Sequence, residues 1–390
     1  MPGLTFTVKL TIVAVLLGAF PVLVQIQLVE GSFGLEIEIE DDDSLEGGDC
    51  SIIGDWNKTT KTCVFTTNPK LGQFIEIRSN DITINCNGHV INGNGSSKNG
   101  ITIEGKGVTV KNCHVTQFHI GIFLDHANGN TLKGNKVMEN KNDGIQLFKS
   151  DNNTLIGNTS YGNKKGIDLD SSNNNYLREN FASNNKQEGI ALSKSDGNVL
   201  EYNISNGNKD DGIDLTLSDR NVLNGNIVNQ NIDDGIDLDN SNENILNANI
   251  VNGNVRDGLD FTRSNDNKLI NNISNGNKDD GIKLYSSNNN ILSGNNANYN
   301  DNVGITLDRV SNSNTLNGNN SNDNKDGFTI INSNENTMNG NFANYNNKRG
   351  IFLLHSESNV LNGNFFHGNG QEGLRVSGPT NNIFNGNIVD

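Results

Sequence analysis

Apolar and polar residues alternate along short stretches of this chain, and each stretch follows a glycine. Residues 213–216, directly after Gly212, read IDLT, so Ile213 and Leu215 fall on one face. Alternation with a period of two predicts a β-strand that buries one face. Leu223 predicts a second short strand, and residues 227–228 a third. A unit of this size is too small to enclose its own core, so it must stack on the next unit.

The unit repeats along most of the chain, and from Gly166 onward its glycine recurs every 23 residues. The glycines are Gly100, Gly121, Gly144, Gly166, Gly189, Gly212, Gly235, Gly258, Gly281, Gly304, Gly327, Gly350 and Gly373. The next residue is apolar in each full unit, as is the twelfth or thirteenth residue, which is Leu223 in the unit quoted above. Apolar residues at fixed places in successive units predict columns along the axis of a parallel β-helix, with units about 4.8 Å apart.

Asparagine recurs at three fixed places in the unit. The three sets begin Asn130, Asn153, Asn175, then Asn135, Asn158, Asn180, and then Asn140, Asn163, Asn185. Asn tolerates the left-handed backbone of a sharp corner, and its amide both donates and accepts hydrogen bonds. We expect identical amides on successive turns to form continuous ladders, which makes these asparagines structural.

Composition alone points elsewhere, because 33% hydrophobic residues, a mean hydropathy of −0.54 and a net charge of −16 favour a disordered chain. The periodicity outweighs that interpretation. The acidic balance also disfavours nucleic acid as a partner, since the chain has no basic stripe.

Four ranges are expected along the chain. Residues 1–34 contain an apolar stretch, Leu10–Val24, that fits a secretory signal peptide; an uncleaved N-terminal anchor, the one expected route to a membrane, is the alternative. Residues 35–49 are expected to form an acidic linker, residues 50–80 a cap around Trp56, and residues 81–390 the β-helix.

The cysteines Cys50, Cys63, Cys86 and Cys113 all lie in the N-terminal third. An even set in an exported chain predicts disulfides, and alignment of two neighbouring units places Cys86 beside Cys113. We therefore predict the pairs Cys50–Cys63 and Cys86–Cys113. A reduced, cytosolic protein is the alternative.

The stretches ITINCNGHVING (residues 82–93) and VTVKNCHV (residues 108–115), with the repeated GIxL…SxxNxL…N, resemble NosD-like proteins and the wider carbohydrate-binding and sugar-hydrolase β-helix superfamily. The resemblance covers roughly residues 50–390 and implies a right-handed helix. It also implies copper handling, for which His89, His114, His119 and His126 are the available ligands. The superfamily includes both enzymes and proteins without known catalysis, so activity does not follow from the fold.

Acidic residues recur on the outward face of the first strand and just before the glycine. The metal candidates are Asp214, Asp237, Asp239, Asp260, Asp234 and Asp257. In a β-helix they would lie about 5 Å apart along the axis and about 7 Å apart along a strand. Such columns repel unless they raise their own pKa values or bind cations, and all-oxygen ligands favour Ca²⁺.

Basic and phenolic residues border the acidic residues and suggest a catalytic activity. Lys283, Tyr285 and Arg263 are the catalytic candidates, because Ca²⁺-assisted polysaccharide lyases on this fold neutralise a uronate and remove the adjacent proton with such a group. The Gly-His-Gly motif of polygalacturonases and the Asp-Pro-His-Asp motif of mannuronan epimerases are both missing. The simplest alternative is that duplication copied one solvated strand.

The sequence thus predicts an all-β protein, a right-handed single-stranded parallel β-helix of about 13 rungs of 22–23 residues with an N-terminal cap. We expect a secreted or cell-envelope protein that serves as a glycan-binding or structural module, with polysaccharide or cell-surface glycan as partner. A Ca²⁺-assisted polysaccharide lyase or hydrolase is the alternative, and a NosD-like periplasmic copper-handling protein is the second. Whether the chain is an enzyme, and its oligomeric state, are left open.

Overall fold

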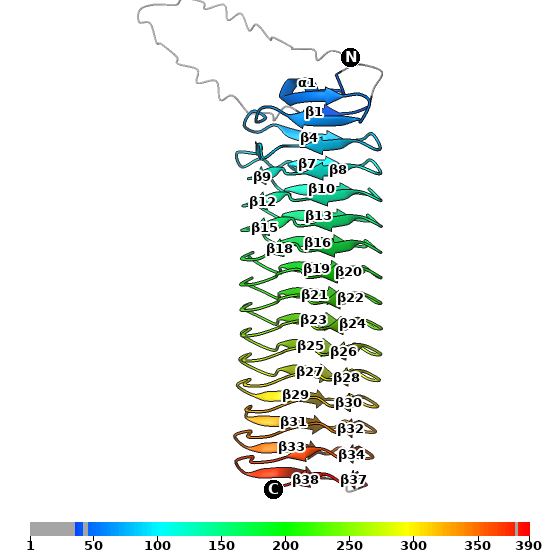
Figure 1. Cartoon of the computed structure of the whole chain (residues 1–390), viewed down its shortest axis with the longest axis vertical. Coiled ribbons are helices and arrows are strands. Elements are labelled where there is room, and N and C mark those ends of the chain that lie inside the picture. Colours follow the sequence, from blue (N-terminus) through cyan, green and yellow to red (C-terminus); the bar gives the residue numbers. More distant parts are fainter. Residues whose placement is uncertain (1–35, 42–45, 379–380) are drawn as a thin grey trace, which may run out of the picture. The chain divides into compact units, whose positions relative to one another are not determined.

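The protein is a right-handed parallel β-helix of about 14 turns. A computed structural model describes residues 36–41, 46–378 and 381–390, and Figure 1 shows their strands stacked in sequence order from β1 to β38. Each turn, called a rung below, has three sides: two carry continuous sheets along the axis, and the third is joined partly by strands and partly by single bridges. The segment predicted as a signal peptide or anchor, residues 1–34, lies outside the described residues.

The first sheet, sheet A, contains the strand that follows each repeat glycine. Its 15 strands pair in parallel along the axis. In order they are β1 (Glu36–Ile39), β4 (Phe74–Ile77), β7 (Ile101–Ile103), β10 (Ile122–Asp125), β13 (Ile145–Phe148), β16 (Ile167–Asp170), β19 (Ile190–Ser193), β21 (Ile213–Thr216), β23 (Ile236–Asp239), β25 (Leu259–Thr262), β27 (Ile282–Tyr285), β29 (Val303–Asp308), β31 (Asp326–Ile331), β33 (Arg349–Leu354) and β36 (Glu372–Ser377).

The second sheet, sheet B, has 16 strands and follows the first corner of each rung. In order they are β2 (Gly54–Asn57), β3 (Thr62–Phe65), β5 (Thr83–Asn85), β8 (Thr109–Lys111), β11 (Thr131–Lys133), β14 (Thr154–Ile156), β17 (Tyr176–Arg178), β20 (Val199–Glu201), β22 (Val222–Asn224), β24 (Ile245–Asn247), β26 (Lys268–Ile270), β28 (Ile291–Ser293), β30 (Thr315–Asn317), β32 (Thr337–Asn339), β34 (Val360–Asn362) and β37 (Ile383–Asn385).

The third side, sheet C, is less regular. Its strands are β6 (Val90–Asn92), β9 (His114–Thr116), β12 (Lys136–Met138), β15 (Thr159–Tyr161) and β18 (Phe181–Ala182), and near the C-terminus β35 (Phe365–Phe366) and β38 (Ile388–Val389). Single parallel bridges, such as Ile227 with Ile250, continue this side between the two groups.

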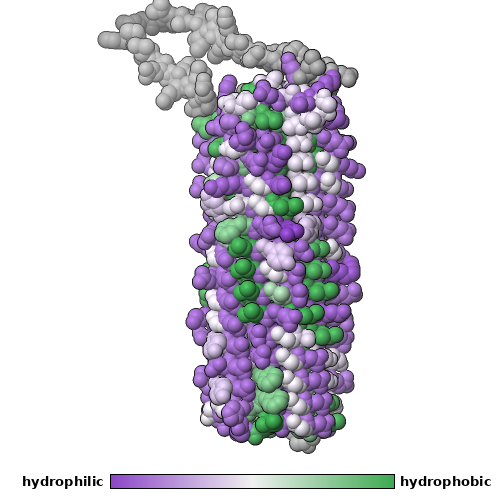
Figure 2. Space-filling model, viewed as in Figure 1, coloured by the Kyte–Doolittle hydropathy of each residue, from purple (hydrophilic) through white to green (hydrophobic). Residues whose placement is uncertain are grey.

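The register of sheet A places like residues over one another. Between β21 and β23, Ile213 pairs with Ile236 and Leu215 with Leu238, and all four side chains are fully buried. This stacking confirms the predicted apolar columns. The surface shows the same order: in Figure 2 hydrophilic residues cover most of the visible face, interrupted by short rows of hydrophobic residues along the axis.

The asparagine ladders are present at all three predicted places. At the second corner, Oδ1 of Asn249 accepts hydrogen bonds from the backbone N–H of Asn226 at 3.0 Å and from its Nδ2 at 2.9 Å. The first-corner ladder depends more on the backbone: the N–H of Asn221 donates to Oδ1 of Asn244 at 2.7 Å, while both Nδ2 groups are buried without a partner.

Close packing explains the repeat glycine. A Cβ at Gly235 would lie 2.6 Å from both Nδ2 of Asn254 and the carbonyl oxygen of Gly258, and it would overlap Val251. A side chain is therefore excluded where sheet A begins against the third ladder.

The N-terminal end differs from the sequence prediction. The range 35–49, expected as an acidic linker, contains β1, which pairs with β4 in sheet A. Ile37 and Ile39 are buried in the core, while Glu36 and Glu38 face outward to Arg78. The acidic residues thus occupy the solvent face of a strand, and sheet A begins well before residue 81.

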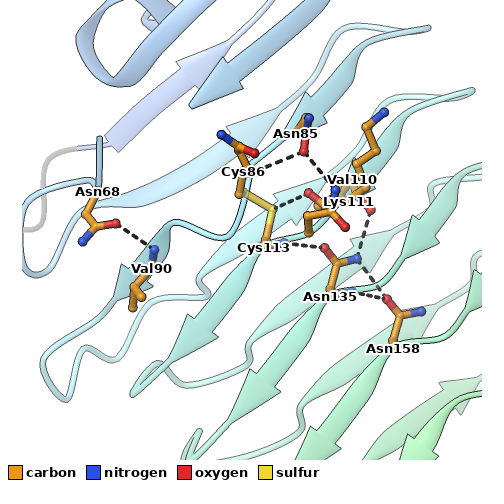
Figure 3. The surroundings of a disulfide bond; sticks show 11 residues. Asn68, Asn85, Cys86, Val90, Val110, Lys111, Cys113, Asn135 and Asn158 are labelled. Carbon is orange, nitrogen blue, oxygen red and sulfur yellow. Dashed lines mark hydrogen bonds between the residues drawn. A yellow bond between two sulfur atoms is a disulfide. The ribbon is translucent and has the colours of Figure 1, made fainter. Parts of the chain in front are cut away.

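Next in the chain come α1 (Cys50–Ile53) and the antiparallel hairpin of β2 and β3, where the cap was expected. Both predicted disulfides are present. Cys50–Cys63 ties α1 to β3 with a Cα–Cα distance of 5.9 Å, and Cys86–Cys113 joins neighbouring rungs at 4.7 Å. Figure 3 shows Cys113 above the second-corner ladder, where its N–H donates to Oδ1 of Asn135.

Two disulfides and no free cysteine among the described residues are typical of a protein from an oxidising compartment, periplasmic or extracellular. Among the described residues, no helix has the length and apolar character needed to cross a bilayer.

Candidate functional site

The acidic residues form two neighbouring columns on the outward side of sheet A. The strand column, at the second residue of each strand, contains Asp214, Asp237 and Asp260. The glycine column, just before each repeat glycine, contains Asp211, Asp234, Asp257 and Asp280. Pairing between β21, β23 and β25 stacks Asp214 on Asp237 and Asp237 on Asp260. We call these seven residues the acidic columns.

Carboxylate oxygens converge within and beside the acidic columns. In each of four groups, one oxygen per residue lies within 4.8 Å of the others: Asp210, Asp211 and Asp233; Asp211, Asp214 and Asp237; Asp234, Asp237 and Asp260; and Asp257, Asp279 and Asp280. The second and third groups share Asp237 and join both columns across successive rungs. The predicted metal candidates other than Asp239 all belong to one of these groups.

The third group has few hydrogen-bond partners within the protein, and its one ion pair joins Asp260 to Lys283 at 3.4 Å. Oδ1 of Asp234 accepts the backbone N–H of Asp257 at 2.7 Å. Oδ1 of Asp260 is buried without a hydrogen-bond donor, and no described residue donates to the carboxylate of Asp237. Three carboxylates therefore meet with several oxygens free for another ligand.

Burial and mutual repulsion raise the pKa values in both columns. Burial, followed by the charges of Asp211 and Asp260, raises the pKa of Asp237 to about 9. Burial and neighbouring carboxylates also raise the pKa values of Asp211 and Asp234 to about 8. At neutral pH these groups are largely protonated unless a cation compensates their charge.

Lys283 continues the strand column directly beneath Asp260. Its Nζ lies 2.8 Å from Oδ2 of Asp257 and 3.4 Å from Oδ2 of Asp260. Burial lowers the pKa of this ammonium, but Asp260 and Asp257 together raise it above its ordinary value. Lys283, a catalytic candidate, is therefore a protonated counter-ion, and these ion pairs disfavour a role as general base.

The other two catalytic candidates lie further along the chain from the strand column: Tyr285 is the last residue of β27, and Arg263 directly follows β25. Arg263 contacts Oδ1 of Asp239 at 2.7 Å, so Asp239 is ion-paired and stands outside the four carboxylate groups. Tyr285 lies on the same strand as Lys283, and the Arg309 guanidinium sits 5.3 Å from its ring centre. The structure thus brings Lys283, but not Arg263, to the acidic columns.

Several residues of the carboxylate groups were not among the metal candidates predicted from the sequence. Asp211 and Asp280 belong to the carboxylate groups, as do the first aspartates of the Asp-Asp-Gly repeats, Asp210, Asp233 and Asp279. The Asp-Asp-Gly repeats were the signal available in the sequence. A carboxylate two residues before the glycine must lie near the carboxylate that directly precedes the glycine, and both recur on neighbouring rungs. Arg256, which borders the columns, pairs with Asp233 at 2.9 Å.

Seven carboxylates with one paired lysine form an all-oxygen surface that can hold hard divalent cations. Ca²⁺ takes six to eight oxygen ligands in flexible geometry, and carboxylates from stacked strands suit it. A Ca²⁺ held by three aspartates keeps positions open for oxygens of another molecule.

Two family models match the chain. The model described as "Periplasmic copper-binding protein (NosD)" matches residues 75–249, and the model described as "Right handed beta helix region" matches residues 233–361. The chain thus resembles NosD-like proteins over residues 75–249, and its fold is a right-handed β-helix. The sequence resemblance is thereby confirmed, and the matches together span residues 75–361.

The donor set of this protein does not fit the copper that the NosD resemblance implies. Copper sites use His, Met or Cys ligands. All four cysteines are in disulfides, and every group of three or more His, Cys, Asp or Glu ligands found in the described part of the chain consists of aspartates. The nearest partner of His89 is Asn68, and that of His126 is Asp125. The residues present therefore support an oxygen-liganded cation instead.

The chain is also similar to several solved structures at low sequence identity. The periplasmic alginate epimerase AlgG is 16% identical, with a TM-score of 0.47, over 84% of this chain and 78% of that one. The A-module of the mannuronan C-5 epimerase AlgE4 from Azotobacter vinelandii is 11% identical, with a TM-score of 0.47, over 80% and 88%. No curated protein matches the sequence.

Proposed function

We propose that this protein is an exported, non-catalytic module that binds acidic polysaccharide through Ca²⁺ held by the acidic columns. The observation that carries the proposal is the group Asp234, Asp237 and Asp260, in which one carboxylate oxygen of each residue lies within 4.8 Å of the others. Among the described residues, only Asp260 has a cationic partner in this group, the Lys283 ammonium at 3.4 Å. Removing such charges from water is unfavourable unless a bound cation compensates them.

Acidic polysaccharide fits this site for two reasons. A protein with a net charge of −16 repels a polyanion, so a bridging cation is required for contact. Ca²⁺ on three aspartates retains coordination positions that uronate carboxylates and hydroxyls can fill. A repetitive column of sites also suits a repetitive polymer, since several weak contacts add along its length.

Binding to polygalacturonate and alginate tests the proposal. We expect both polymers, immobilised on beads, to retain the protein in CaCl₂ and to release it in EDTA. Asp237→Asn removes one carboxylate from two of the groups and should abolish retention. Asp266→Asn is the matched control, because it makes the same change at an exposed corner where Asn174 and Asn289 already adopt the same positive φ. Retention that is insensitive to EDTA and to Asp237→Asn would contradict the proposal.

The same incubations test the alternative activity. A lyase would release unsaturated sugars with ultraviolet absorbance, whereas a binding module leaves the polymers intact. The ion pairs of Lys283 support the second outcome.

A further inference from the structure

A second surface feature lies at the third corner, on the side of the rung where sheet C ends. Here an open groove of about 380 Å³ runs over several rungs. Its lining residues are Asn206, Asn229, Gln230, Asn252, Gly253, Asn275 and Gly276. None of them is charged, which sets the groove apart from the acidic columns. A volume of this size is within the range of ligand sites.

One wall of the groove is a row of asparagine amides on successive rungs. Oδ1 of Asn229 accepts the backbone N–H of Asn252, and Oδ1 of Asn252 accepts that of Asn275, each at 2.8 Å. These bonds fix the orientation of the amides, because the oxygen is the atom that must face the protein. No described residue accepts a hydrogen bond from Nδ2 of Asn229, Asn252 or Asn275. Half-buried N–H donors thus face the groove about 4.8 Å apart.

The floor and ends of the groove come from the next column of residues. Gly253 and Gly276 have φ angles of +67° and +65°, and a Cβ on Gly276 would meet no atom within 4 Å. Gln230 closes one end, since its Cγ would lie 3.8 Å from a Cβ on Gly253. One rung beyond Gly276 the same column carries Tyr299, a residue that is 64% exposed.

We propose that this groove binds an uncharged, extended β-1,4-linked polysaccharide, independently of the acidic columns and without a cation. Sugar hydroxyls and ring oxygens accept hydrogen bonds from the amides, and the hydroxyls can also donate. Equatorial linkages give a flat chain that can lie along a straight glycine floor. The rise per sugar along such a chain is similar to the rung spacing, so successive sugars come within reach of successive amides, with alternate sugars presenting opposite edges. Tyr299 offers its apolar ring face to a sugar at the end of the groove.

Two substitutions test the groove. Gly276→Gln fills it with a residue that its own column already accepts, because Gln230 has a φ of 58°. Tyr299→Ala removes the stacking platform. Gly318→Gln is the matched control, because this glycine also has a φ of +59° and open space at its Cβ position but lies in the second-corner column, away from the groove. That column already holds a large side chain at Tyr202, with a φ of 53°. Equal melting temperatures of the variants and the wild type would show that all are folded.

The probes are cellohexaose and chitohexaose, titrated into the full chain in EDTA and followed by calorimetry. We expect at least one probe to bind, with affinity at least tenfold weaker in Gly276→Gln and in Tyr299→Ala and unchanged in Gly318→Gln and Asp237→Asn. Absence of binding by both probes, or binding that ignores both Gly276→Gln and Tyr299→Ala, would overturn the inference. Binding that needs CaCl₂ and is lost in Asp237→Asn would also overturn it while supporting the acidic columns. If the proposed function of the acidic columns is wrong, the bead assay with polygalacturonate and alginate will show it, whatever the result with cellohexaose and chitohexaose.

Discussion

Lys283 lies directly beneath Asp260 in the strand column, and its Nζ reaches Oδ2 of Asp257 at 2.8 Å. An ammonium thus follows three stacked aspartates and neutralises the last of them. Above it, Asp237 has no such partner. The contrast shows two ways of compensating a column of carboxylates, one with a cation built into the protein and one with a cation from solution.

Replacing Lys283 should destabilise the protein and strengthen cation binding. Lys283→Met leaves Asp257 and Asp260 without their counter-charge, so we expect a loss of about 1–3 kcal/mol in the free energy of unfolding at pH 8 in EDTA. Added CaCl₂ should restore more stability to this variant than to the wild type. Melting curves with and without Ca²⁺ measure both effects, and Lys268→Met on the exposed face of β26 is the control. A variant as stable as the wild type in EDTA would contradict this role.

The raised pKa values predict that stability depends on pH when cations are removed. Asp211, Asp234 and Asp237 have folded pKa values of about 8, 8 and 9, above the ordinary value of 3.8. The folded state therefore binds more protons than the unfolded state, and stability must fall as pH rises from about 4 to about 9. We expect a steady decrease in Tm over this range in EDTA. Asp237→Asn should flatten the curve, and a curve that rises toward pH 9 would exclude the shifts.

The second-corner ladder should be a major source of stability. Asn249→Ala removes the acceptor for the N–H and Nδ2 of Asn226 and the donor to Leu223 and Asn272. Because buried partners are then left unpaired, we expect a cost of about 3 kcal/mol or more in unfolding free energy. Asn271→Ala is the control, since Ala248 already occupies the same exposed column at a similar φ. Equal losses in denaturant titrations of the two variants would rule out a special role for the ladder.

The disulfides should stabilise the N-terminal rungs. They close segments with sequence separations of 13 and 27 residues, and loss of either is expected to cost about 3 kcal/mol. Because all four cysteines are fully buried, reductant should act slowly on the native protein. Denaturant titration of the Cys86→Ser/Cys113→Ser variant against the wild type measures the loss of stability. Thiol counting with and without denaturant measures how fast reductant reaches the disulfides. Rapid reduction of the folded chain would be the contrary result.

Much of the fold was predictable because the repeat itself fixes what lies over what. Once Gly212 and Gly235 occupy equivalent places, the register of Ile213 on Ile236 follows from their offset. The same offset predicted the ladders, and the alignment of residues 82–86 with residues 108–113 predicted the pairing of Cys86 with Cys113. The strand at 36–39 was missed because it precedes the regular repeat and its outward residues are acidic, so its charge obscured the alternation of Ile37 and Ile39.

The candidate site was predictable only as columns. Stacking places Asp237 between Asp214 and Asp260, which the sequence indicates. It does not indicate which carboxylates find donors, since that depends on side-chain reach. Asp239 is removed from the cluster by Arg263, and Lys283 turns toward the aspartates, because the long basic side chains bridge neighbouring rungs. The amide groove was missed because its asparagines resemble those of the buried ladders.

Calorimetric titration of CaCl₂ into chelator-treated protein at pH 7 tests the central claim most directly. Asp234, Asp237 and Asp260 should give saturable binding that releases protons, because Asp234 and Asp237, with pKa values of about 8 and 9, must ionise to bind the cation. Titrations in two buffers of different ionisation enthalpy count those protons. We predict that Asp237→Asn weakens binding at least tenfold while Asp266→Asn leaves it unchanged. No saturable heat in the wild type, or the same isotherm in Asp237→Asn, would contradict a Ca²⁺ site at the acidic columns.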